Sequence, residues 1–401
     1  MSTRRDFLSA ASVAGLTAVS YGRVLGANEK LNIGLIGSGN RGRTILTETM
    51  KLGHKCVALA DVAGFRMEVV TETAIKAAKQ EKPRFFDNHK DLLGHPGIDA
   101  VIVATPDHHH KACLIDACQA QKDVYVEKPL TKQISDGQDM IDAVRKNKRI
   151  VQVGNQRHSG PHWQKAREIV QSPEFGDLCW VKVWDCRNWV KKDPFAVPTS
   201  FTDAQRKSVN WKAFLGNATD RPFDATRYWA WRWYWDYAGG LMTDIGAHQL
   251  DIVQWLSGVS MPKSAVANGG VYQFKHWETP DVVHGVWDYG TFAATFAVEF
   301  VNGFDGVGCA FYGTKMTLVA DAEKEVRIYK TIDKPLESTR PIDSWAVPNE
   351  TTMHVRNWLE SVAARKDPNS PIELGHQVIV AAHMANESYR TGKRVERKAT
   401  T

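Results

Sequence analysis

The stretch GSGNRG, residues 37–42, constrains the fold of this chain more than any other part of the sequence. An apolar run over residues 31–36 leads into it and a helical pattern follows, which is the strand–turn–helix context of a dinucleotide-binding G-x-G-x-x-G. In that context Gly37 permits the tight turn, Gly39 lets a pyrophosphate approach the backbone, and Gly42 lets the helix pack closely on the strand. The N–H groups and partial positive charge at the helix N-terminus then favour the phosphates.

A carboxylate at the end of the second apolar run indicates which dinucleotide this loop favours. The run CVALADV, residues 56–62, ends in Asp61, 19 residues after Gly42. A carboxylate at this distance accepts hydrogen bonds from the adenosine ribose hydroxyls and repels a 2′-phosphate, so NAD is favoured over NADP. Three nearby arginines weaken that preference, Arg41, Arg43 and Arg66. A strand-end helix cap is the alternative for Asp61. We expect Asn40, Arg41 and Asp61 to contact the cofactor together with the glycines.

The order of the apolar runs predicts a doubly wound parallel sheet. Further strands are expected over residues 99–106, 123–130 and 149–154, with a helix over 110–121. Strands alternating with helices in this way build parallel βαβ units. The N-terminal domain is therefore expected to have a Rossmann-type α/β fold.

Ligands of such sheets bind beyond the carboxyl ends of the strands. Thr105 and Pro106 end one expected strand, and Glu127 and Lys128 end the next. We expect all four at the crevice that holds the glycine loop. Three consecutive histidines (108–110) follow the first of these strands, but consecutive side chains project in different directions, so we predict no metal site.

Residues 227–251, RYWAWRWYWDYAGGLMTDIGAHQLD, combine aromatic rings with an acid and a base. Four of the 14 tryptophans of the chain alternate here, and in an extended segment they would project to one side. Such rings stack on the C–H face of a pyranose; the alternative is that they pack the core between the domains. Asp244 and His248 follow four residues apart, so on one helix they share a face. The alternative for this pair is a surface ion pair.

Taken together, the motifs resemble those of the Gfo/Idh/MocA family, which includes glucose–fructose oxidoreductases and inositol dehydrogenases. They are GSGNRG (37–42), ATPDHHH (104–110), EKPL (127–130) and GGLMTDIGAHQLD (239–251). The resemblance runs from about Leu31 to near the C-terminus. It implies an α/β fold, in which a Rossmann domain precedes an α/β domain with a large, open, mostly antiparallel sheet. That sheet often serves as an oligomer interface in the family, so a homo-oligomer is expected.

The resemblance also implies roles for three residues: Lys128 is similar to the active-site lysine of the family, and Asp244 and His248 to its aspartate and histidine at the substrate. The family transfers hydride between a nicotinamide and a carbon bearing a sugar or cyclitol hydroxyl. Oxidising a secondary alcohol requires a base with a pKa near 7, which histidine supplies. A lysine ammonium stabilises the developing alkoxide. Additional substrate contacts are expected from Arg157, Trp235 and Tyr237.

The N-terminal residues predict export. TRRDFLSAASVAGLTAVSYGRVLGA, residues 3–27, has paired arginines followed by a weakly apolar stretch, the outline of a twin-arginine signal; a disordered basic N-terminus is the alternative. The stretch is too short and too polar for a stable membrane anchor. The net charge of +6 includes no basic run, so nucleic acid binding is not expected. We expect a periplasmic or otherwise extracytoplasmic protein.

The sequence predicts four parts: a signal segment (1–27), a Rossmann domain (28–152), a substrate and oligomerisation domain (153–380), and a C-terminal helix and tail (381–401). Three functions remain open. The first is an NAD-dependent dehydrogenase of a sugar, glycoside or cyclitol that keeps its cofactor tightly bound, because free NAD is scarce outside the cytoplasm. The second is a redox-neutral glycosidase or lyase, in which transient oxidation precedes β-elimination; a tyrosine, Tyr228, Tyr234 or Tyr237, is then the second acid/base group. The third is a non-catalytic Rossmann-type binding protein.

Overall fold

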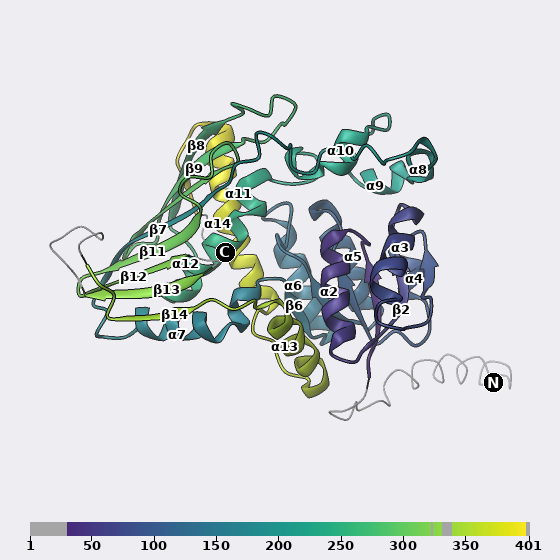
Figure 1. Ribbon diagram of the computed structural model, residues 1–401, viewed down its shortest axis with the longest axis horizontal. Helices are drawn as coiled ribbons and strands as arrows, with labels where there is room; N and C mark the ends of the chain where they lie inside the picture. Colours follow the sequence, from purple (N-terminus) through teal and green to yellow (C-terminus); the bar gives the residue numbers. More distant parts are fainter. Residues whose placement is uncertain (1–29, 322–323, 331–338, 398–401) are drawn as a thin grey trace, which may run out of the picture.

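The computed structural model describes residues 30–321, 324–330 and 339–397, and the predicted signal segment lies outside them. Figure 1 shows a parallel sheet with its helices at one end of the molecule and a larger sheet at the other. The long helix α14 (Ile372–Thr391) lies between them. None of the helices in the described part of the chain combines the length and apolarity that crossing a bilayer demands.

The first sheet has six parallel strands in the order β3-β2-β1-β4-β5-β6, which confirms the predicted Rossmann-type fold. Its central strands are buried on both faces, as expected for a parallel sheet covered by helices on either side. The strands are β1 (Asn32–Ile36), β2 (Lys55–Ala60), β3 (Arg84–Phe86), β4 (Ala100–Val103), β5 (Asp123–Val126) and β6 (Val151–Val153). The helical elements are α2 (Asn40–Lys51), α3 (Gly64–Val70), η1 (Thr71–Ile75), α4 (His89–Leu93), α5 (Asp107–Gln119) and α6 (Asp136–Asn147). Strand β3, at the edge, was not predicted from the sequence.

Helix α13 (Thr351–Ala364) was predicted to belong to the second domain, but it packs on the first sheet. The Trp358 indole is fully buried and meets the ring of Tyr125 on β5 edge-on, at 5.6 Å between centroids. The Thr352 hydroxyl donates to Glu48 on α2 at 2.7 Å. The chain thus returns to the Rossmann domain after β14, before its last strand, β15, joins the second sheet. The predicted boundary at residue 381 is also wrong, because α14 runs through it without a break.

The second sheet has nine strands in the order β14-β13-β12-β11-β7-β10-β9-β8-β15. Only β7 and β10 pair in parallel, so the prediction of a large, mostly antiparallel sheet is confirmed. The strands are β7 (Leu178–Cys186), β8 (Ser264–Gly270), β9 (Val282–Asp288), β10 (Ala293–Glu299), β11 (Val307–Gly313), β12 (Met316–Asp321), β13 (Glu325–Lys330), β14 (Asp343–Ala346) and β15 (Val395–Glu396).

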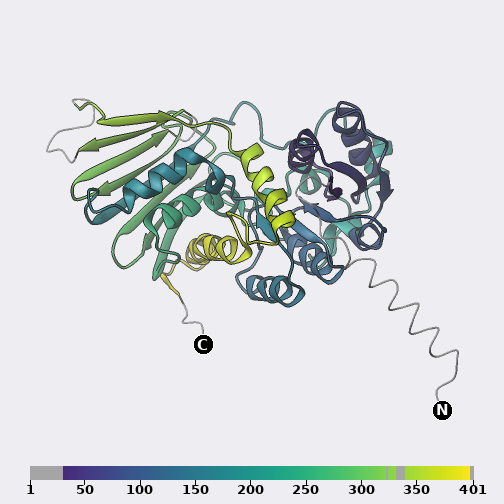
Figure 2. The ribbon, with the colours of Figure 1, turned by 90° about the horizontal axis from the view of Figure 1, so that it is seen from below.

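One face of this sheet is covered by helices and the other is open (Figure 2). Helices α7 (Pro161–Val170), α12 (Gly246–Ser257) and α14 lie on the covered face, and the indole of Trp287 on β9 donates to the Ala381 carbonyl of α14 at 2.9 Å. The open face carries the exposed side chains of Trp180, Val266 and Val286. The oligomer interface expected on this face stays a prediction.

The connection from β7 to α11 (Gly240–Asp244) leaves the second sheet and crosses to the first. It contains α8 (Asp203–Ser208), α9 (Trp211–Leu215), α10 (Ala225–Trp229) and the 3-10 turn η3 (Trp231–Trp233), and Figure 1 shows its helices beside α3 and α5. The Asn210 N–H donates to the Val62 carbonyl at 2.8 Å, just beyond the end of β2. We call residues 187–239 the crossing segment. It brings side chains of the second half to the carboxyl edge of the first sheet.

The expectation that four tryptophans project from an extended strand is wrong. Residues 225–229 form α10 and residues 231–233 form a 3-10 turn, so the rings point in several directions. Trp233 is fully buried and stacks on Trp277 at 4.1 Å, whereas Trp229 and Trp231 remain partly exposed. A helical turn forms here because Asp224 caps it, accepting hydrogen bonds from the Thr226 and Arg227 N–H groups.

Candidate active site

The glycine loop has the geometry that a dinucleotide phosphate requires. Gly37 has φ +92°, and a Cβ there would lie 2.6 Å from the Ala104 carbonyl oxygen. A Cβ on Gly42 would lie 2.2 Å from the Gly37 oxygen, so the helix and strand approach as closely as glycine allows. A Cβ on Gly39, in contrast, would meet nothing within 4 Å, so this residue faces open space. No side chain of the described residues caps α2 at Gly39, which leaves its first N–H groups for an anion.

Asp61 lies at the end of β2 and faces the same loop. Its Oδ2 accepts the Ser38 N–H at 2.7 Å and its Oδ1 accepts the Ala63 N–H at 3.0 Å. Burial raises the pKa of this carboxyl, whereas Arg66 and the backbone donors oppose the shift. Each carboxylate oxygen has a second lone pair, so the group can accept ribose hydroxyls while the backbone holds it in place. Asp61 can therefore accept hydrogen bonds from an adenosine ribose while it also caps the turn that follows β2.

The ends of β4 and β5 meet beside the loop. Arg41 Nε donates to Glu127 Oε1 at 2.7 Å, which joins the start of α2 to the end of β5. His110 Nδ1 lies 2.8 Å from the Pro129 carbonyl and its Nε2 lies 3.0 Å from the Thr105 carbonyl, so its ring spans the two strand ends. The imidazole fixes Thr105 and the Lys128–Pro129 turn relative to each other.

A cavity of about 390 Å³ lies between the first sheet and the crossing segment. The glycine loop, Arg41 and Asp61 line one end, and residues 104–107 and 127–128 form its floor. The crossing segment, the end of α11 and the start of α12 supply the remaining wall, with Phe195, Trp229, Trp231, Arg232, Asp244 and His248. The predicted cofactor residues of the first domain and the predicted catalytic residues Asp244 and His248 of the second therefore share one cavity.

Lys128 and Asp244 form the charged centre of this cavity. The Lys128 ammonium lies 2.7 Å from Asp244 Oδ1 and 2.8 Å from the Asp244 carbonyl oxygen, and both side chains are less than one-sixth exposed. Arg232 Nε lies 3.5 Å from the other carboxylate oxygen. Burial alone raises the pKa of Asp244, but the Lys128 and Arg232 cations hold it well below its usual range. Asp244 is thus ionised, and a third donor of the ammonium is left for a ligand.

His248 lies on the wall beside this pair, but not on the same helix as Asp244. Helix α11 ends at Asp244 and α12 begins at Gly246, so the prediction of one continuous helix is wrong. Burial lowers the pKa of His248 well below 6.5, and the Lys128 and Arg157 cations add to the effect. The imidazole is therefore neutral at neutral pH, the protonation state in which it accepts a proton.

Asp107 is a further carboxyl in the cavity that sequence analysis did not select. It begins α5, directly after Pro106, and it is only 3% exposed. Burial and the negative charge of Asp244 raise its pKa to about 8, against the opposing cations Arg232 and Lys128. Two acidic side chains in one cavity thus have opposite protonation states at neutral pH. Its position two residues after Thr105, at the carboxyl end of β4, was the signal that could have found it.

Two models of one protein family match this chain. The first, described as an oxidoreductase family with an NAD-binding Rossmann fold, matches residues 31–155. The second, the GFO/IDH/MocA C-terminal domain, matches residues 214–319, and together they cover more than half of the chain. The chain belongs to the Gfo/Idh/MocA family. Residues 31–155 are accordingly an NAD-binding Rossmann domain, and the family is one of oxidoreductases.

Several relatives within the Gfo/Idh/MocA family are named inositol dehydrogenases. The inositol 2-dehydrogenase of Salmonella typhimurium is 30% identical over 147 residues, 36% of this chain and 41% of that protein. The uncharacterized oxidoreductase YrbE of Bacillus subtilis is 28% identical over 144 residues, 36% of this chain and 40% of that protein. The chain therefore matches only about two fifths of the length of these relatives.

Solved structures of similar fold cover nearly the whole chain. Levoglucosan dehydrogenase in complex with NADH and levoglucosan has a TM-score of 0.70 at 16% identity, over 92% of this chain and 99% of that one. The WlbA dehydrogenase of Bordetella pertussis in complex with NADH and UDP-GlcNAcA has a TM-score of 0.67 at 17% identity, over 93% of this chain and 100% of that one. At these identities the likeness shows the fold.

The three residues predicted to bind substrate do not line the cavity of this Gfo/Idh/MocA protein. Arg157 lies behind it and donates to the His248 carbonyl at 3.0 Å. Tyr237 is fully buried against His108, with ring centroids 5.1 Å apart. Trp235 lies at a second cavity, beside α14. The remaining predicted site residues, from the glycine loop to His248, all lie together, apart from Gly42, which supports the loop from within α2.

Proposed function

We propose that this protein is an NAD-dependent dehydrogenase that oxidises a secondary hydroxyl of a sugar, glycoside or cyclitol. The observation that carries the proposal is the Lys128–Asp244 pair beside a neutral His248, in the cavity that also holds the glycine loop. These groups supply a base and a positive charge at one point, which an alcohol oxidation needs. The inositol and levoglucosan dehydrogenases among the similar proteins support this class of substrate.

In the proposed mechanism, Lys128 positions the reacting hydroxyl. Two of its three ammonium donors are held by Asp244, which fixes the direction of the third. The third hydrogen bond stabilises the oxygen as negative charge develops on it. His248 removes the hydroxyl proton, and its lowered pKa keeps it unprotonated before the reaction. NAD, when bound, accepts the hydride that leaves the same carbon.

The walls of the cavity support a hydroxylated ring as the substrate. Trp231 offers an aromatic face, and the Arg232 guanidinium lies between it and Phe195, 4.2 Å and 4.4 Å from the two ring centroids. Aromatic faces of this kind take the C–H side of a sugar ring, while charged side chains at the rim bind its hydroxyls. The crossing segment carries all three side chains to the cavity wall.

We further propose that the protein is exported by the twin-arginine route and carries its NAD with it. The paired arginines at positions 4 and 5 motivate the export. The crossing segment supports retention, because Asn210 and Arg66 fasten it to the first domain beyond the cofactor loop: Arg66 Nε donates to the Tyr228 hydroxyl at 2.6 Å. Mass spectrometry of protein purified without added nucleotide and then denatured tests this point. NAD at close to one equivalent is the expected result, and a nucleotide-free sample that binds NAD only weakly would contradict it.

A redox-neutral cleavage of glycosides is the second candidate, and Asp107 favours it. Oxidation two carbons from the glycosidic carbon acidifies the C–H that lies between them, and elimination then needs one group to take that proton and another to protonate the leaving oxygen. With a pKa of about 8, Asp107 is protonated at neutral pH and suits the second role. The buried Tyr237 is poorly situated for this, since it does not line the cavity.

One assay separates the two functions. The protein, loaded with NAD, is incubated with inositols, monosaccharides and aryl glycosides, and both reduced nicotinamide and released aglycone are measured. Reduced nicotinamide with intact glycosides supports the dehydrogenase. Aglycone release without net reduction supports cleavage, in which case Asp107→Asn should abolish release while a first-turnover oxidation persists. Protein that retains NAD but converts none of these classes would leave a binding protein as the better description.

A further inference from the structure

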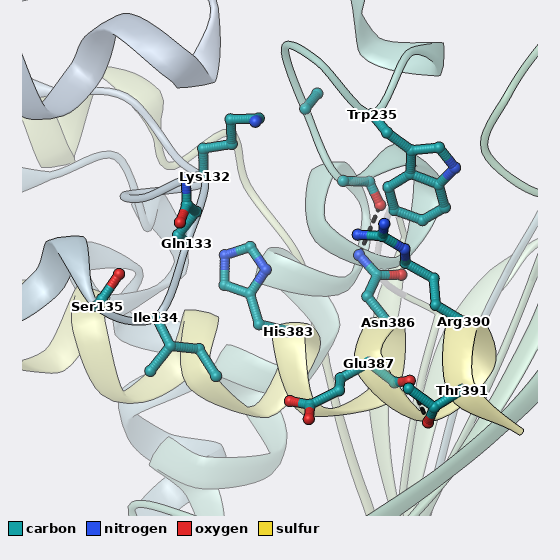
Figure 3. A pocket seen from close by; sticks show the side chains of 12 residues that line it. Lys132, Gln133, Ile134, Ser135, Trp235, His383, Asn386, Glu387, Arg390 and Thr391 are labelled. Atoms are coloured by element: carbon teal, nitrogen blue, oxygen red, sulfur yellow. Dashed lines mark hydrogen bonds between the residues drawn. The ribbon is translucent and has the colours of Figure 1, made fainter. Parts of the chain in front are cut away.

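A second cavity, of about 670 Å³, lies on the other side of the segments that carry the catalytic pair. None of its lining residues lines the first cavity. One wall is the loop from Lys132 to Ser135, which follows the Glu-Lys-Pro turn, and the opposite wall is one face of α14. Figure 3 shows the Lys132 side chain across the opening from the guanidinium of Arg390, which lies next to Trp235.

The positive charges of this second cavity lack carboxylate partners. Within the described ranges, no Asp or Glu oxygen lies within ion-pair distance of the Lys132 ammonium or of the Arg390 guanidinium. Arg390 instead lies over the Trp235 ring, 5.2 Å from its centroid. Two cations that face one cavity and are engaged in no ion pair favour an anionic ligand.

The aromatic side chain of the cavity is held in a fixed orientation. The Trp235 indole Nε1 donates to the Glu278 carbonyl at 2.9 Å, and the Trp235 N–H donates to the Glu278 carboxylate at 3.1 Å. A ring fixed in this way presents an apolar surface at little cost in side-chain entropy. Sequence analysis selected this tryptophan as a sugar-stacking residue, and the structure puts it here rather than in the first cavity.

Hydrogen-bond acceptors complete the wall formed by α14. His383 Nε2 donates to the Thr131 carbonyl at 3.0 Å, and burial lowers the pKa of His383 to about 4, so its Nδ1 is an acceptor. Asn386, which is 95% buried, donates through Nδ2 to the Gly239 carbonyl at 2.8 Å, and its Oδ1 has no protein partner among the described residues. Glu387 adds a solvent-exposed carboxylate. Acceptors of this kind suit ligand hydroxyls.

From these observations we infer that the second cavity binds an acidic monosaccharide, that is, a hydroxylated ring carrying one carboxylate or phosphate. The anionic group lies between Lys132 and Arg390, the C–H face of the ring lies on Trp235, and the hydroxyls donate to acceptors on α14. The volume is within the range of small-molecule sites.

The second cavity is built on the backbone of the first. The Thr131 carbonyl that His383 holds lies three residues after Lys128, and the Gly239 carbonyl that Asn386 holds directly precedes α11, which ends at Asp244. A ligand bound against α14 therefore contacts His383 and Asn386, the side chains that hold the backbone next to Lys128 and Asp244. The inference does not depend on the proposed reaction, since binding can be measured without turnover.

The test is calorimetric titration of the NAD-loaded full chain with glucuronate, glucose 6-phosphate, glucose and inorganic phosphate. At least one of the two acidic sugars should bind, and the better of them identifies the anionic group. The double variant Lys132→Met/Arg390→Met should weaken this binding by about tenfold or more. Lys393→Met removes a cation just beyond α14 and outside the cavity, and it should leave the affinity unchanged. His248→Ala, altered in the first cavity, should also retain it.

Several results would overturn the inference. The first is that neither acidic sugar binds at millimolar concentration. The second is that the wild type and the double variant bind the sugar with equal affinity. Inorganic phosphate binding as tightly as glucose 6-phosphate would show an anion site with no sugar recognition. Loss of binding in His248→Ala, but not in the double variant, would assign the sugar to the first cavity. A thermal melt of each variant identifies any loss of binding that comes from unfolding.

Discussion

Replacing Lys128 by methionine tests both the stability and the chemistry assigned to the buried pair. The substitution keeps the length of the side chain and removes the ammonium that contacts Asp244 through two hydrogen bonds, 2.7 Å and 2.8 Å long. Asp244 is only 8% exposed. After the substitution, the cation that remains beside its carboxylate is Arg232, at 3.5 Å. The pKa of Asp244 should rise from its present low value toward or above the ordinary range.

The expected cost follows from this geometry. Removing one partner of a buried ion pair typically lowers the free energy of unfolding by about 3–5 kcal/mol. Because Arg232 partly compensates the remaining charge, we expect the lower end, about 3 kcal/mol. For catalysis, loss of the group that stabilises the developing alkoxide should lower kcat/KM by about 10²- to 10⁴-fold, equivalent to about 2.7–5.4 kcal/mol of transition-state stabilisation.

A double-mutant cycle distinguishes the pair from its surroundings. Urea denaturation of the wild type, Lys128→Met, Asp244→Asn and the double variant gives the coupling energy, which we expect at about 1–3 kcal/mol. The double variant should be more stable than Lys128→Met alone, because it no longer buries an uncompensated carboxylate. Turnover is followed by the absorbance of reduced nicotinamide. A coupling energy near zero, or wild-type kcat/KM in Lys128→Met, would refute the reasoning.

Four further predictions follow from the same site. His248→Ala should lower turnover by about 10²- to 10⁴-fold with NAD affinity nearly unchanged. Because burial lowers the pKa of His248, kcat/KM of the wild type should begin to fall only below pH 6.5. A fall in kcat/KM on the acid side centred above that pH would contradict the assignment. Asp61→Ala should weaken NAD and relax its preference over NADP, as measured by the ratio of the two dissociation constants; an unchanged ratio would remove the ribose contact. Asp107→Asn should raise the free energy of unfolding at pH 7, because the unfolded carboxyl is ionised there while the native one stays protonated; in urea denaturation the gain should grow from about pH 4 to pH 8 and be constant above pH 8, and equal stabilities of variant and wild type at pH 7 would contradict the raised pKa. The free energy of unfolding of the wild type should fall as the pH drops below about 6.5, because the unfolded chain binds protons that the buried histidines of the folded protein exclude. The expected loss is up to about 1.4 kcal/mol per pH unit for each such histidine. Denaturation midpoints that do not change from pH 7 to pH 5 would contradict this.

The first domain was predictable because its signals are local. The glycine spacing, the apolar runs and Asp61 each lie within one βαβ unit, so a parallel, Rossmann-type sheet could be predicted from the chain alone. The Glu-Lys-Pro turn and the Asp244–His248 spacing likewise predicted residues that the structure brings to one cavity. Edge strand β3, only three residues long, carried too little pattern to be recognised.

The errors arose where tertiary contacts override local pattern. The tryptophan alternation resembles a strand, yet the Asp224 cap and burial of Trp233 against Trp277 select helical turns. Asp244 and His248 have helical spacing, but α11 stops between them, at Asp244, where the side chain turns to Lys128. Asp107 went unnoticed because its chemistry comes from burial and from the neighbouring charge of Asp244, and neither is a property of the sequence around it.

The return of the chain to the first sheet through α13 limits how this protein can be divided. A fragment that ends near residue 155 would lack Trp358 and Thr352, and it would expose to water the apolar surface of Tyr125 that the indole covers. Chimaeras with other members of the family should therefore exchange the nucleotide-binding half and residues 351–364 as a single set, although some two hundred residues separate them in the sequence.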